Sequence, residues 1–194
     1  METQTNFSQS KWILFNCIGW VLGVIILLLI SAGLESIKWE GQAAIAIGMG
    51  LGVGFMQWLV LSKQFSISLN WCWFLMIGLF IPFLAYDILA RYVTLAPEWG
   101  IVPATAIGAL LTGYLQYNFI LKKISEKTKP WIIYNFLGWF VTAAFLMAIS
   151  LLIVMFKSER YIMAILSVLS IIFGGIILGA ITGNGWKKIL KEMV

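Results

Sequence analysis

Six long apolar segments are the feature that most limits how this chain can fold. They cover residues 12–30, 43–61, 71–89, 101–121, 131–156 and 161–181, with short connections between them. A helix needs about 20 mostly apolar residues to cross a hydrocarbon core of about 30 Å. Only 11% of the 194 residues are charged, whereas soluble domains carry about 25%. The sequence therefore predicts an all-α integral membrane protein with six transmembrane helices in a single membrane domain, residues 1–194.

The apolar segments repeat along the chain in pairs. The first segment of each pair opens with a tryptophan, and a glycine follows seven residues later; the tryptophans are Trp12, Trp71 and Trp131. The second segment of each pair carries Gly-x-x-Gln or Gly-x-x-Thr, beginning at Gly54, Gly113 and Gly179. A fixed period with two apolar segments per period predicts three tandem two-helix hairpins, covering about 11–62, 70–122 and 130–188. We expect the hairpins to surround an approximate threefold axis along the membrane normal.

Glycines at one-turn spacing accompany these signatures. Gly50 and Gly54 lie four residues apart in the second segment, and Gly175 and Gly179 do so in the last. Small residues at this spacing let helix backbones approach closely, which holds helices together in lipid. We interpret these glycines as packing positions. Gly100, next to an outer connection, is not expected at a helix contact.

The distribution of Lys and Arg predicts the orientation. Nine of the 13 basic residues fall on the side of the two termini: Lys11, Lys63, Lys122, Lys123, Lys127, Lys129, Lys187, Lys188 and Lys191. The positive-inside rule therefore places both termini in the cytoplasm of a bacterial inner membrane, plasma or thylakoid. Membrane lipids, including anionic headgroups, are the expected partners of this basic side. No basic face on a soluble surface is predicted, so we expect no nucleic-acid partner.

The composition argues against an enzyme. The chain has no histidine, which removes histidine-ligated haem, most zinc sites and histidine-based triads. Cys17 and Cys72 fall near the cytoplasmic ends of their segments, where a structural disulfide is not expected. We expect no catalytic residue, no metal and no obligate cofactor, although a lipid or a carotenoid-like pigment is compatible with the composition.

Four amide side chains share one predicted depth. Asn16 and Asn135 each lie four residues inside a repeat tryptophan, and Gln57 and Gln116 lie near the cytoplasmic ends of their segments. A buried amide requires partners, because burying it unpaired costs several kcal/mol. Two interpretations stay open. The amides bond to one another and to backbone carbonyls as interhelical contacts, or they line a ligand pocket together with Tyr114, Tyr117 and Tyr134.

Two further pairs of residues are candidates. Asp87 is an acid within an apolar segment, where acids are functional candidates, but Arg91 follows at i+4 and predicts an ion pair at the helix end. Trp20 and Trp139 occupy the same repeat position, deeper than interfacial tryptophans usually lie. Their indoles either fill space between helices or stack on a lipid tail, a carotenoid or an aromatic ligand.

The block Gly54-Phe-Met-Gln57-Trp-Leu-Val-Leu61 resembles a motif in small multi-pass membrane proteins of cyanobacteria and other bacteria. The resemblance covers the first two hairpins well and the third poorly, since Thr182 stands in place of the glutamine; it implies a membrane fold and no activity. In size and pattern the chain is also similar to the substrate-capture subunits of energy-coupling-factor vitamin transporters. Their first helix carries Ala-x-x-x-Ala, where this chain has Gly19-Trp-Val-Leu-Gly23.

These observations favour a non-enzymatic membrane protein. We expect a packing or assembly subunit that contacts other membrane subunits and binds a lipid or pigment. The alternative is a small-molecule transporter, or the substrate-binding subunit of one, with the amides as its site. The two are distinguished by whether the amides line a cavity or are closed off by hydrogen bonds.

Overall fold

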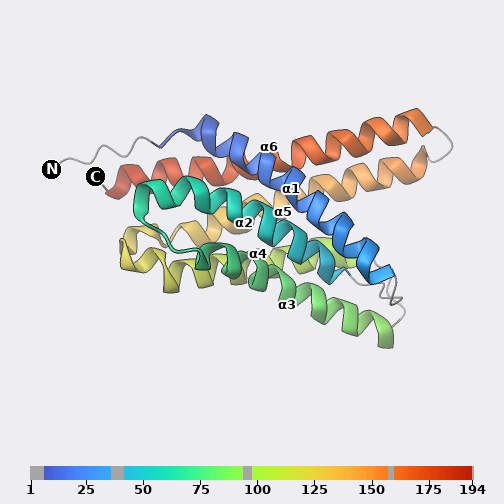
Figure 1. Cartoon of the computed structure of the whole chain (residues 1–194), viewed down its shortest axis with the longest axis horizontal. Helices are drawn as coiled ribbons and strands as arrows, with labels where there is room; N and C mark the ends of the chain where they lie inside the picture. The colour runs from blue at the N-terminus through green and yellow to red at the C-terminus, as the bar shows by residue number, and fades with distance from the viewer. Residues whose placement is uncertain (1–6, 36–41, 94–97, 157–159, 194) are drawn as a thin grey trace.

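The structure is a computed structural model that describes residues 7–35, 42–93, 98–156 and 160–193. These residues form six α-helices: α1 (Gln9–Glu35), α2 (Ala43–Phe65), α3 (Asn70–Tyr92), α4 (Glu98–Phe119), α5 (Trp131–Met155) and α6 (Arg160–Met193). Two short 3-10 helices, η1 (Leu121–Lys123) and η2 (Glu126–Thr128), connect α4 to α5. Successive helices run antiparallel, so both termini lie at the same end of the bundle (Figure 1). We call it the terminal end and the opposite one the far end. The all-helical prediction is confirmed for the described residues.

Five helical stretches are long and apolar enough to cross a membrane: Gln9–Gly33, Ala43–Phe65, Asn70–Tyr92, Glu126–Met155 and Arg160–Met193. The sequence predicted six spans, and α4 is not among these five. It has 22 residues, nearly as many as α2 and α3. Its composition explains the difference, because Pro103, Thr105, Thr112 and Gln116 lower its hydropathy. The chain is therefore described as membrane-embedded through five apolar helices.

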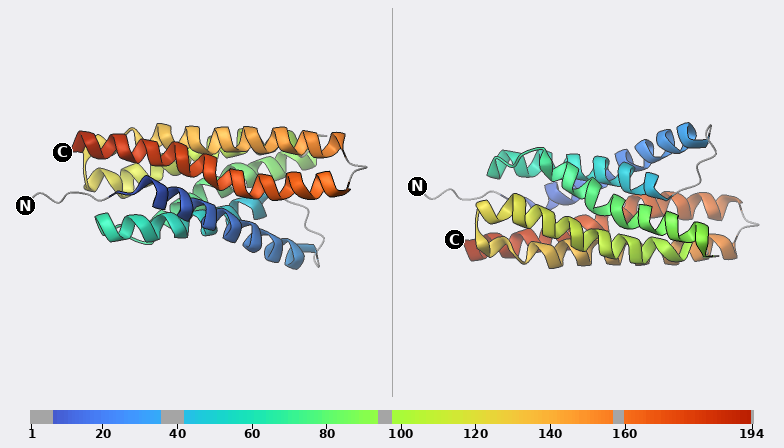
Figure 2. Two further views of the ribbon diagram at one scale, coloured as in Figure 1. Left: turned by 90° about the horizontal axis from the view of Figure 1, so that it is seen from above. Right: turned by 90° about the horizontal axis from the view of Figure 1, so that it is seen from below.

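The six helices form a closed ring. Each helix packs against the next one in the chain, and α6 packs against α1. Figure 2 shows the bundle from two opposite sides. Side chains from all six helices therefore face a shared interior.

Glycines allow neighbouring helices to approach closely. A Cβ added at Gly52 of α2 would lie 2.4 Å from the backbone nitrogen of Gly23 in α1, and one at Gly50 would lie 2.4 Å from the Cα of Met76 in α3. Such distances leave no space for a side chain, so these glycines are required for the observed packing. The expectation for Gly100 was wrong. A Cβ there would lie 2.1 Å from the Tyr86 ring, because the amino end of α4 rests on α3.

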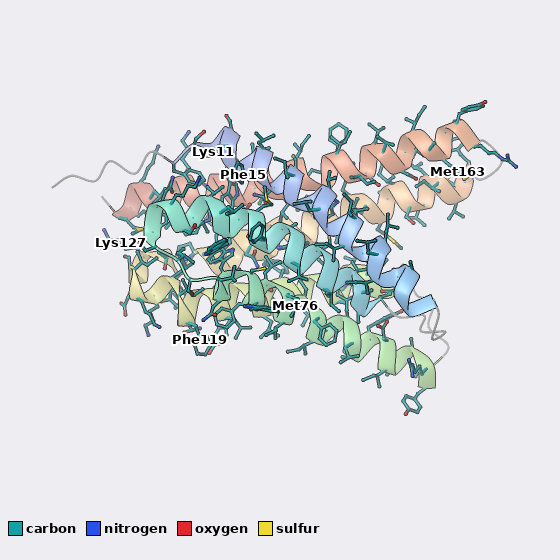
Figure 3. All side chains as sticks on the ribbon, in the orientation of Figure 1. Lys11, Phe15, Met76, Phe119, Lys127 and Met163 are labelled. Carbon is teal, nitrogen blue, oxygen red and sulfur yellow. The ribbon has the colours of Figure 1, made fainter. Side chains whose placement is uncertain are left out.

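The two ends of the ring differ in packing. Figure 3 shows Lys11 and Lys127 at the terminal end and Met163 at the far end. Near the terminal end the interior is filled with buried aromatic side chains. Toward the far end α1 and α6 diverge, as Figures 1 and 2 show. Between Arg160 and Phe173 of α6, no side chain is fully buried.

Candidate functional site

Four tryptophans fill the interior at the terminal end. Trp12, Trp71 and Trp131 are completely buried, and Trp186 is 1% exposed. The ring centroids of Trp131 and Trp186 lie 5.1 Å apart, and those of Trp71 and Trp131 lie 5.4 Å apart. Trp12 is 6.3 Å from Trp131. We call these four residues the tryptophan cluster. Three of its members are the residues that open the repeated segments.

Each repeat tryptophan donates a hydrogen bond to the helix that precedes it in the ring. The Nε1 of Trp71 donates to Oε1 of Gln57 over 3.2 Å. The Nε1 of Trp131 donates to Oε1 of Gln116 over 2.8 Å, and that of Trp12 donates to Oγ1 of Thr182 over 2.9 Å. The same bond thus joins α2 to α3, α4 to α5, and α6 to α1.

A close glycine contact accompanies each of these bonds. A Cβ added at Gly54 would lie 3.0 Å from the Cα of Cys72, which follows Trp71 in the chain. The corresponding distances are 2.9 Å between Gly113 and Ile132, and 2.8 Å between Gly179 and Ile13. In all three cases the glycine and the residue that accepts the indole bond are three positions apart, so the two residues lie on one face of their helix. We call this combination of bond and glycine contact a joint.

The four predicted amides are all completely buried, and the structure brings them into the interior. Gln57 Nε2 donates to Asn16 Oδ1 over 2.9 Å, and Asn16 Nδ2 donates to its own helix, at the carbonyl of Trp12, over 2.8 Å. Gln116 Nε2 donates to the carbonyl of Trp71 over 3.3 Å. The first bond joins α2 to α1 and the last joins α4 to α3, whereas the bond of Asn16 Nδ2 stays within α1. The amides therefore serve as interhelical contacts in the described structure.

Asn135 is the least satisfied of the amides. Its Nδ2 donates to the carbonyl of Ala109 over 2.7 Å, which joins α5 to α4. Its Oδ1 has no hydrogen-bond partner among the described residues. The amide layer is therefore not one continuous network, because Asn16 and Gln57 bond directly whereas Asn135 bonds to a backbone carbonyl.

The three candidate tyrosines lie in different surroundings. Tyr117 is buried against the tryptophan cluster. Tyr134 is half-buried, with the Lys188 Nζ 5.8 Å from its ring centroid. Tyr114 is 56% exposed and lies on the outer surface of the ring. Tyr114 is thus placed away from the buried amides.

Asp87 has a role that its sequence position did not indicate. Its carboxylate accepts hydrogen bonds from the backbone N–H groups of Gln42 and Ala43, over 2.8 and 2.9 Å. These groups belong to the first turn of α2, where four N–H groups have no partner within the helix. A carboxylate there also interacts favourably with the helix dipole. Asp87 caps α2 from α3, and its ion pair with Arg91 stays a prediction.

A small cavity lies on the far-end side of the amides. It has a volume of about 70 Å³ and is lined almost entirely by apolar side chains of α1 to α5, among them Met49, Leu79 and Phe83. Trp20 and Trp139 also line it, with ring centroids 5.7 Å apart and planes inclined by 35°. None of the four amides is among the lining residues.

Two polar groups belong to this cavity. Thr105 of α4 lines it, and its side chain is buried. The Nε1 of Trp139 is buried and has no hydrogen-bond partner among the described residues. The sequence identified Trp20 and Trp139 through their shared repeat position, whereas no motif marked Thr105 as a cavity residue.

No family model, curated protein or solved structure matches this chain. The resemblance to bacterial multi-pass proteins therefore stays a prediction. Within the described residues, no three His, Cys, Asp or Glu side chains are grouped so that they could hold a metal ion.

Proposed function

We propose that all six helices span a bacterial inner membrane as three hairpin repeats joined in a ring. The three equivalent joints support this arrangement, because the third joint closes the ring between the last helix and the first. In this arrangement α4 crosses the membrane between α3 and α5, against which it packs. The lysines near both termini support a cytoplasmic location of the terminal end.

We further propose that the chain is a non-enzymatic packing or assembly subunit that binds a hydrophobic molecule, a lipid or a pigment, inside the ring. One observation carries this proposal: the buried amides bond to neighbouring helices, with only Asn135 Oδ1 unpaired among the described residues, while the central cavity is lined almost entirely by apolar side chains. A site for acid–base chemistry or for a polar solute requires polar groups that are available to the substrate. Apolar lining with few polar groups is typical of sites for hydrophobic ligands.

The test is to purify the protein in a mild detergent and to identify co-purifying molecules by mass spectrometry. We expect a stoichiometric lipid or pigment, and partner subunits in the same preparation. Recovery of the protein with no hydrophobic molecule above the level in an unrelated membrane protein contradicts the proposal. A polar solute retained in a manner that depends on Gln57 and Gln116 instead supports the alternative, a transporter or transporter subunit.

A further inference from the structure

We propose that the central cavity binds the end of a hydrophobic chain that bears one hydrogen-bond acceptor, such as a carbonyl oxygen, and that the indole N–H of Trp139 is its donor. This inference rests on the proposed function, since it specifies the site and the chemistry of the hydrophobic molecule. Among the described residues, the Nε1 of Trp139 has no hydrogen-bond partner, and the side chain of Trp139 is 3% exposed and lines the cavity.

An unpaired buried N–H group is costly, because the group has lost its hydrogen bonds to water and gained none in return. The indoles of Trp12, Trp71 and Trp131, which open the repeated segments, each donate to a side chain. The Nε1 of Trp186, like that of Trp139, is buried without a partner among the described residues. Trp139 differs from these four tryptophans because its side chain lines the cavity. An acceptor in the cavity would satisfy its N–H, and Thr105 adds a second polar group from α4, the helix next to α5 in the ring.

The volume of the cavity limits the size of the group that can bind in it. A volume of about 70 Å³ is about half that of an engineered protein cavity that binds benzene, about 150 Å³. The cavity therefore accommodates the end of a chain and not a large ring system. The remaining part of such a chain must leave the ring.

The divergence of α1 and α6 provides the place where the chain leaves. None of the cavity-lining residues belongs to α6, and Trp20 packs between the cavity and Gly174 of α6. Beyond Gly174, α6 has no fully buried side chain up to Arg160, and α1 and α6 separate toward the far end (Figure 2). The tail of the ligand passes from the cavity between these two helices into the hydrocarbon of the bilayer.

The experiment compares two probes that differ by one atom group. These are 2-undecanone, labelled with ¹³C at its carbonyl, and 2-methyl-1-undecene, in which a CH₂ group replaces the oxygen. Each probe is added to the purified protein in lipid nanodiscs. Thermal unfolding measures its stabilisation of the fold, because a ligand of the native state raises the midpoint. Infrared spectroscopy follows the labelled carbonyl, with empty nanodiscs subtracted.

Three variants distinguish the contribution of the N–H donor to binding from that of the cavity. Trp139→Phe removes the N–H group and keeps an aromatic ring, Ala143→Leu fills the cavity from α5, and Trp73→Phe makes the same change on the outer surface. We expect the ketone to bind the wild type about tenfold more tightly than the alkene, as one additional hydrogen bond predicts. Trp139→Phe should abolish this preference and the shifted carbonyl band. Ala143→Leu should weaken both probes, and Trp73→Phe should behave as the wild type.

Equal stabilisation by the two probes, or a carbonyl band that does not depend on Trp139, overturns the inference. In either case a hydrophobic molecule that co-purifies with the protein leaves the proposed function standing. If neither probe stabilises the wild type and no hydrophobic molecule co-purifies, both the inference and the proposed function fail.

Discussion

Substituting Gly179 by alanine tests the joint between the last helix and the first. The added Cβ would lie 2.8 Å from the Cα of Ile13 and 3.1 Å from the Cβ of Asn16. Carbon atoms in contact prefer a separation of about 3.5–4.0 Å, so α6 must move away from α1 by about 1 Å or accept overpacking. Overpacking a well-packed interior costs about 1–3 kcal/mol.

The helix propensity of alanine acts in the opposite direction. Replacing glycine by alanine in a helix interior gains about 1 kcal/mol when nothing obstructs the methyl group. We therefore expect Gly179→Ala to destabilise the protein by about 0–2 kcal/mol. Gly33 is the matched control, because a Cβ added there meets no atom within 4 Å. Gly33→Ala should be neutral or up to about 1 kcal/mol more stable than the wild type.

The assay is reversible unfolding in mixed micelles of increasing SDS content, followed by far-ultraviolet circular dichroism. Tryptophan fluorescence reports the tryptophan cluster in the same samples. Gly179→Ala should have the lower unfolding midpoint of the two variants. If Gly179→Ala is as stable as Gly33→Ala, then α6 and α1 do not approach each other at this position, and the reasoning about the joint is refuted.

Three other predictions concern the buried side chains that join helices, the cap of α2 and the orientation in the membrane. Gln57→Leu leaves the Trp71 indole and the Asn16 amide without their partner and should lower the stability by about 1–3 kcal/mol. Thr182→Val removes one bond between helices and should lower the stability less. Equal stability of both variants and the wild type would contradict the role of these side chains. Asp87→Asn removes the charge that caps α2 and should cost about 0.5–2 kcal/mol, with the loss seen first as increased hydrogen exchange at the start of α2; unchanged exchange there contradicts the cap. In intact cells, an impermeant thiol reagent should label a cysteine at Tyr161 and not one at Lys127, and the reverse pattern inverts the proposed orientation.

The spacing of residues along the chain predicted the positions of the joints but not their chemistry. Trp71 and Gln57 were each recognised as repeat positions, because their types recur at a fixed period. Their hydrogen bond depends on which helix faces which. Periodicity places a residue at a depth in the membrane and leaves the neighbouring helix unspecified, so the indole donors were not predicted as partners of the amides.

Local sequence was a poor guide where the partner is distant in the chain. Arg91 is one turn from Asp87, yet the carboxylate of Asp87 accepts from backbone groups 44 and 45 positions away. The contact of Gly100 with Tyr86 was missed for the same reason. Residues 101–121 were predicted as a span from the length of their apolar segment, whereas the hydropathy of α4 does not place it among the candidate spans.

The most direct test of the ring is a cross-link between its first and last helices, α1 and α6. In the structure, Gln9 Nε2 of α1 donates to Asn184 Oδ1 of α6 over 2.9 Å. Cysteines replace these two residues in a chain whose Cys17 and Cys72 have been changed to alanine, and a short bismaleimide joins neighbouring thiols. The control pair combines the cysteine at Gln9 with one at Asn118.

Mass spectrometry of the digested monomer identifies the linked peptides. The closed ring predicts an intramolecular cross-link between residues 9 and 184 in the monomer, and little or none between 9 and 118. A chain that links 9 to 184 only between two molecules, or as weakly as the control pair, contradicts the closure of the ring by the third joint.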